Sequence, residues 1–166
     1  MTDYSWIYEA KEIEGWDKTA EFSVGGFLWL GFSRKFPHLM LCISSQKTTL
    51  VDMDTGDKVE VDCEYDEDEL VAMTSALPDE MVPIVGKFDG ELPLVSTFGD
   101  EVRLIEFADS HVEIYFRTQG HPPQLIYKCW HYICGFSPDG RYFLLVDDMG
   151  VRIFKRQLDQ EIGGEK

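Results

Sequence analysis

The sequence is short of basic residues. Its 166 residues include 15 Lys and Arg against 31 Asp and Glu, so the formal net charge is −16. Binding to nucleic acid or to anionic lipid depends on Lys and Arg that displace counterions from phosphate groups. The charge therefore excludes nucleic-acid and membrane-surface binding as the primary activity, and it favours a basic protein as partner.

Long hydrophobic segments are missing as well. No apolar run approaches the roughly 20 residues that a helix needs to span a bilayer. Residues 1–15 do not show the basic-then-apolar layout of a secretion signal. The four cysteines, Cys42, Cys63, Cys129 and Cys134, lack the two closely spaced pairs typical of zinc sites. We expect a cytoplasmic globular protein with reduced, buried thiols and no metal or cofactor.

Motifs of common catalytic and phosphate-binding sites are absent too. The chain has no G-x-S-x-G, Walker loop, G-x-G-x-x-G or H-E-x-x-H. Residues 54–56 match the Asp-Thr-Gly triplet of aspartic proteases, but Asp57 follows in place of a small residue and no second triplet exists. A hairpin turn explains this triplet, and a calcium loop starting at Asp52 lacks the glycine and glutamate at their required positions. We therefore expect that the protein is not an enzyme.

Most of the chain has the hydrophobic pattern of short β-strands. Residues 39–44 form a continuous apolar run, which is typical of a strand buried on both faces. Three further segments, 48–63, 102–117 and 141–156, each have two strand-like arms around a turn, as β-hairpins do, and apolar and polar residues alternate in the second arms over 58–63 and 112–117. With 11 Phe, 7 Tyr and 4 Trp, the chain has ample apolar mass for a core. The pattern predicts a mainly β fold, either a single antiparallel sheet or a sandwich.

One or two short helices are expected within this fold, so an α+β arrangement stays open. Residues 66–76 begin with an Asp-x-x-Glu cap and end before a proline. Residues 3–14 fit a second helix and an edge strand equally well. We expect one globular domain over residues 1–156, followed by a polar tail over residues 157–166.

One segment repeats a pattern known from other β proteins. Residues 135–154, GFSPDGRYFLLVDDMGVRIF, resemble the blade repeat of WD-type and TolB-type β-propellers, in which such a turn precedes an apolar inner strand. Residues 31–33 begin a weaker copy, in which residues 34–36 replace the Pro-Asp-Gly turn. A propeller needs at least about four blades of roughly 40 residues each, which leaves no room for the acidic helix. We interpret the repeat as a local turn motif within an antiparallel sheet.

The acidic residues are concentrated in one segment. Residues 52–69 contain ten acids and a single base, Lys58, which is a net charge of −9. Such a run is often a solvated face that keeps a protein soluble, but it also attracts and steers a basic partner. Small acidic proteins that neutralise basic toxins, such as bacterial immunity proteins, are similar to this chain in size and charge.

Two functions of different classes follow from these observations. The first is an acidic interaction module of the immunity-protein or antitoxin type, which binds and could inhibit a basic protein. The residues predicted to contact that partner are Asp57, Glu60, Asp62, Glu64, Asp66, Glu67, Asp68 and Glu69.

The alternative is a small-ligand-binding β domain with an aromatic pocket, since Trp and Tyr are enriched at binding sites. The residues predicted to line that pocket are Trp29, Trp130, His131 and Tyr132. Each of them also fits core packing within a strand. An enzyme that uses His131 with a nearby carboxylate is a further possibility.

Overall fold

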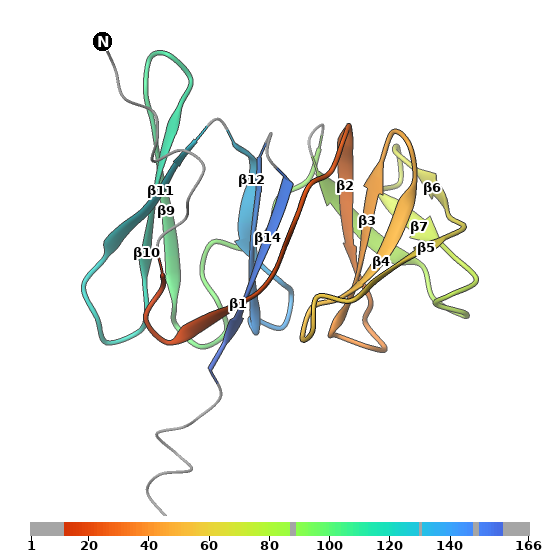
Figure 1. The fold of residues 1–166 in the computed structure, drawn as a ribbon, viewed down its shortest axis with the longest axis horizontal. Helices are drawn as coiled ribbons and strands as arrows, with labels where there is room; N and C mark the ends of the chain where they lie inside the picture. Colours follow the sequence, from red (N-terminus) through yellow and green to blue (C-terminus); the bar gives the residue numbers. More distant parts are fainter. Residues whose placement is uncertain (1–11, 87–88, 130, 148–149, 158–166) are drawn as a thin grey trace, which may run out of the picture.

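The computed structural model describes residues 12–86, 89–129, 131–147 and 150–157. Within these ranges the chain forms fourteen β-strands in three antiparallel sheets and no helix (Figure 1). Consequently the described ranges contain no helix that is long and apolar enough to cross a membrane. The prediction of a mainly β, antiparallel fold is confirmed, while the prediction of one or two helices is wrong for these ranges, and three sheets replace the single sheet or sandwich.

The largest sheet has seven strands and curls into a half-barrel. Its strand order is β5-β4-β3-β2-β8-β7-β6, so β5 and β6 are its two edges. Only Asp62 and Cys63 connect these edges in the chain, and so short a connection requires the sheet to bend round on itself. The strands are β2 (Phe27–Phe32), β3 (Leu39–Ser44), β4 (Thr48–Asp52), β5 (Lys58–Val61), β6 (Glu64–Asp66), β7 (Val71–Met73) and β8 (Val82–Gly86).

Two smaller sheets complete the fold. The central sheet has the order β1-β14-β13-β12, and the outer sheet has the order β11-β10-β9. The first described strand therefore pairs with the last one, which joins the two ends of the described chain (Figure 1). The strands are β1 (Trp16–Phe22), β9 (Glu101–Glu106), β10 (Val112–Arg117), β11 (Gln124–Cys129), β12 (His131–Phe136), β13 (Tyr142–Asp147) and β14 (Gly150–Arg156).

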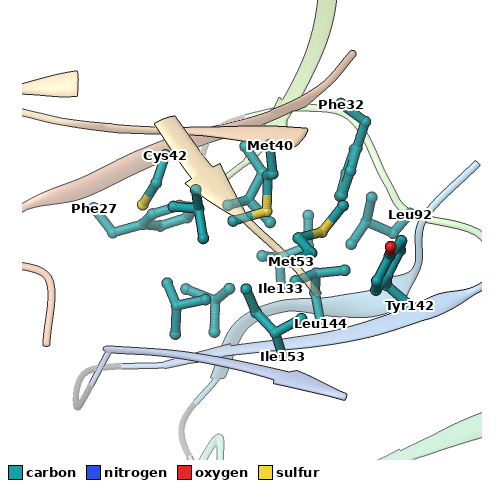
Figure 2. Packing of buried hydrophobic residues seen from close by; sticks show 14 residues of the cluster. Phe27, Phe32, Met40, Cys42, Met53, Leu92, Ile133, Tyr142, Leu144 and Ile153 are labelled. Carbon is teal, nitrogen blue, oxygen red and sulfur yellow. The ribbon is translucent and has the colours of Figure 1, made fainter. Parts of the chain in front are cut away.

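The central sheet is covered on both faces. Phe143 lies in the hydrophobic cluster that the central sheet shares with the outer sheet. Its neighbour Leu144 points the other way, into the cluster between the central sheet and the half-barrel, where Figure 2 shows it near Met53 and Ile153. A third cluster, which includes Trp29, fills the inside of the half-barrel. The fold is thus a stack of three sheets with the half-barrel at one end.

The predicted strands are found where the hydrophobic pattern placed them. Residues 39–44 form β3, and its four middle residues are buried. The three predicted hairpins are the pairs β4–β5, β9–β10 and β13–β14. In the two copies of the repeat, Ser33 and Ser137 each donate a backbone N–H to the returning strand, at 3.1 and 2.9 Å. The repeat is therefore a turn motif that occurs twice in antiparallel sheets, and the fold is not a propeller.

The predicted helix over residues 66–76 is wrong. The Asp66 carboxylate does accept backbone N–H groups two and three residues ahead, at 2.8 and 3.1 Å, as a helix cap would. The chain then makes a single turn, because Leu70 adopts a left-handed conformation with a φ of 56°. Ala72 next pairs with Val82 of β8 and becomes buried. Pairing with the half-barrel thus outweighs the local preference for helix.

The predictions for the two ends of the chain fall mostly outside the described residues. Residues 12–14 are not helical, and the rest of the segment 3–14 is not described. In the predicted polar tail, Gln157 is the described residue. Its backbone N–H donates to Gly15 O at 2.8 Å, and its side-chain amide donates to Asp17 at 3.1 Å.

Candidate functional site

The acidic segment lies on the outer surface of the half-barrel, along β5, β6 and the turn that leads to β7. All eight residues predicted to contact a partner are exposed. Within the described ranges, none of the eight forms an ion pair with a Lys or Arg. Lys58, the single base of the segment, places its ammonium group 4.4 Å from the centre of the Phe22 ring. The surface therefore keeps its negative charge without neutralising partners among the described residues.

Three of the eight carboxylates also hold the local structure. Glu67 accepts a hydrogen bond from the indole N–H of Trp29 at 3.0 Å. Asp62 accepts one from the Ser75 hydroxyl at 2.6 Å, and this bond lowers the pKa of Asp62 below its ordinary value. Asp66 caps the turn described above. The side chains of the other five make no hydrogen bond among the described residues, and these five are Asp57, Glu60, Glu64, Asp68 and Glu69.

A groove of about 540 Å³ lies beside this surface, between β6, β7 and the loop before β8. Two methionines in its lining are strongly exposed, Met73 by 52% and Met81 by 57%. The lining also includes four carboxylates and no Lys or Arg. The carboxylates are those of Asp62, Glu64, Asp79 and Glu80. We call this feature the methionine groove.

Strand pairing explains how the methionine groove is built. Met73 lies opposite Glu64 in the β6–β7 pair, and the neighbouring side chain, Ala72, is buried in the half-barrel. Because side chains of a strand alternate between faces, Met73 points outward. Glu80 accepts the Ser33 hydroxyl at 2.6 Å and the backbone N–H of Arg34 at 2.9 Å, so this wall of the groove is fixed.

The sequence analysis did not predict four of the six side chains that define this groove, namely both methionines and two of the four carboxylates. Met73 lies within the segment 66–76 that was predicted as a helix, and its exposure follows only from the strand that forms there. Asp79, Glu80 and Met81 lie beyond Pro78, outside the acidic run. The sequence does contain a signal for this part of the groove, since two acidic residues and a methionine follow Pro78 directly.

Among the four residues predicted for the alternative aromatic pocket, Trp29 is the one whose side chain the structure describes. Trp29 is 1% exposed and packs in the core of the half-barrel. His131 and Tyr132 belong to β12 in the central sheet. Their side chains and the whole of Trp130 lie outside the described residues. Trp29 and these two strand residues therefore come from different sheets.

The other chemical candidates have structural explanations. Burial raises the pKa of the Cys42 and Cys134 thiols to about 12, so both are protonated at neutral pH and poorly suited to act as nucleophiles or metal ligands. The described residues contain no group of three or more His, Cys, Asp and Glu placed to hold a metal ion. Residues 54–56 form the β4–β5 turn, where Asp54 accepts the Tyr142 hydroxyl at 2.6 Å and pairs with Lys155 at 2.8 Å.

The strongest candidate site is thus an anionic surface beside a groove with exposed methionine side chains. Carboxylates in this setting attract cationic groups, and methionine adapts its shape to apolar side chains of many kinds. No known protein family matches the chain, and neither a curated protein nor a solved structure is significantly similar to it.

Proposed function

We propose that the protein is an interaction module that binds a basic protein through the acidic surface of the half-barrel. The observation that carries the proposal is the exposure of eight carboxylates that have no ion-pair partner among the described residues. Such a surface gains from a cationic partner, because the like charges repel one another until they are neutralised.

The proposed role of this charge is mainly to speed and direct association. Complementary charges raise association rates and suppress wrong partners more than they add raw affinity. The partner would present clustered Lys and Arg, as proteins that bind phosphate-rich targets do. Covering such a cluster would inhibit the partner, as in the immunity proteins that this chain is similar to in size and charge.

The test compares three tagged forms of the protein as baits in a native lysate. One is the native chain, and two are variants in which three exposed glutamates are changed to glutamine. The site variant is E60Q/E64Q/E69Q, and the control variant, with the same change in net charge, is E12Q/E91Q/E106Q. Captured proteins are eluted with steps of increasing salt and identified by mass spectrometry.

We expect the native and control baits to retain the same basic protein at low salt and the site variant to lose it. The Kd of the purified pair should then rise steeply between low and moderate salt, because screening shortens the range of exposed charges to about 8–10 Å. Equal capture by both variants, or binding that is insensitive to salt, would contradict the proposal.

A further inference from the structure

We infer that the partner docks in the methionine groove, and that its docking segment is a basic amphipathic helix whose apolar face covers Met73 and Met81. This inference rests on the proposed function and specifies the chemistry of the partner. It adds an apolar component to a contact that the charges alone would make purely electrostatic.

The exposure of the two methionines is the first step of the argument. Met73 and Met81 leave 52% and 57% of their surface in contact with solvent, on the lining of the same groove. Exposed apolar side chains that lie together on one surface mark interaction sites more often than isolated ones do. Methionine is also the side chain used by proteins that accept varied amphipathic helices, because it is unbranched and polarizable.

Charge complementarity is the second step. Four carboxylates line the groove and no Lys or Arg does. Two of them are held in place, Asp62 by the Ser75 hydroxyl and Glu80 by Ser33 and Arg34. An occupant with apolar side chains must therefore be flanked by Lys or Arg, and a neutral or acidic segment would leave the rim without counter-charge.

The strand geometry favours a helix over an added β-strand. β6 forms one edge of the half-barrel but has three residues, so an extended peptide would find few main-chain groups to pair with. A helix is anchored instead by side chains at i, i+3 or i+4, and i+7. With a diameter of about 10 Å, it would bring such side chains to the methionines and Lys or Arg to the rim.

Two synthetic peptides of equal length and charge test the inference. The first places leucines at helical spacing among lysines, and the second has every leucine replaced by serine. Binding of each fluorescently labelled peptide is followed by anisotropy with the native protein, with M73Q/M81Q and with M73L/M81L. The matched control is V95Q/I105Q, which changes two side chains exposed by 58% and 41% away from the groove.

We expect the leucine peptide to bind the native protein about tenfold more tightly than the serine peptide. M73Q/M81Q should lose that difference, whereas M73L/M81L and V95Q/I105Q should keep it. All four proteins should melt within a few degrees of one another, since the changed side chains are exposed.

The other outcomes separate the two proposals. Equal binding of both peptides by the native protein, or an undiminished difference in M73Q/M81Q, would overturn the groove inference and leave the acidic surface as the binding element. If neither peptide binds at low salt, the proposed affinity for basic partners fails together with the groove inference.

Discussion

The indole N–H of Trp29 donates a hydrogen bond to a carboxylate oxygen of Glu67 across 3.0 Å. Trp29 is 1% exposed and lies in the core of the half-barrel, whereas Glu67 is exposed in the turn between β6 and β7. The bond joins a residue predicted for a ligand pocket to one predicted for a partner surface. The hydrogen bond therefore fixes the β6–β7 turn to a buried side chain of the half-barrel.

This relationship predicts that E67A destabilises the protein. The substitution removes the acceptor of the Trp29 indole N–H, and the loss of such a bond typically costs about 1 kcal/mol. Urea unfolding followed by tryptophan fluorescence measures the change. E69A is the control, because the Glu69 side chain makes no hydrogen bond among the described residues. Equal urea midpoints for E67A and E69A would show that the Trp29–Glu67 bond contributes nothing to stability.

The Asp54 site predicts a pH-dependent contribution to stability. Burial alone would raise the pKa of Asp54, but hydrogen bonds from Lys155 and Tyr142 outweigh it and lower the pKa below its ordinary value. A carboxyl with a lower pKa in the folded state stabilises the fold above its unfolded pKa of about 3.9, and this contribution disappears as the pH falls. We expect D54N to be less stable than the native protein at pH 7 and the difference to shrink below about pH 4.

The effect of D54N should be small, less than about 1 kcal/mol, because solvent screens a partly exposed pair. The Asp54 and Lys155 side chains are 37% and 32% exposed. Urea unfolding between pH 3 and pH 7 measures the difference, with D57N as control. A stability difference that stays constant across this range would rule out the assigned pKa shift.

The two-sided burial of the central sheet predicts that adjacent substitutions in β13 are both severe. Phe143 and Leu144 are each 0% exposed, on opposite faces. We expect F143A to cost roughly 3–5 kcal/mol and L144A roughly 2–5 kcal/mol, because each leaves a cavity in a different cluster. In β9, by contrast, V102A should destabilise and R103A should change stability by less than about 0.5 kcal/mol, since Arg103 is exposed.

Chemical denaturation of these four variants measures the comparison. A mild effect of either β13 substitution would mean that one face of the central sheet is not packed as described. A severe effect of R103A would mean that the outer face of the three-stranded sheet is covered.

The β9–β10 turn predicts a stabilising substitution. Ser110 is exposed and has a φ of 74°, a left-handed conformation that costs a non-glycine residue about 1–2 kcal/mol. Glycine adopts it freely but loses about 0.5–1 kcal/mol of backbone entropy on folding. We expect S110G to raise the free energy of unfolding by about 0.5 kcal/mol, measured by thermal and urea unfolding.

The control for S110G is S45G, because Ser45 is exposed and does not have a positive φ. It should lose stability through backbone entropy alone. A loss of stability in S110G equal to that in S45G would contradict the assigned turn conformation.

The strands could be predicted from the sequence because their signals are local. The apolar run 39–44 indicates a strand that is buried on both faces, and the alternation in residues 112–117 specifies which side chains face the core, whatever the strands later pair with. The helix prediction failed at residues 66–76 for the opposite reason. The N-terminal cap of the predicted helix is present. After the turn at Leu70, however, the chain pairs with β8 and continues as a strand instead of a helix.

The candidate site, too, was predictable from the sequence in one part and not in the other. The exposure of the acidic residues follows from the high cost of burying unpaired carboxylates, so the sequence alone determined an anionic surface and the approximate positions of the strands. The half-barrel, the exposure of Met73 and Met81, and the Trp29–Glu67 bond were decided by the tertiary structure. Each of them depends on which distant strands pair and on how the sheet curls, and no local pattern of residues specifies those long-range contacts.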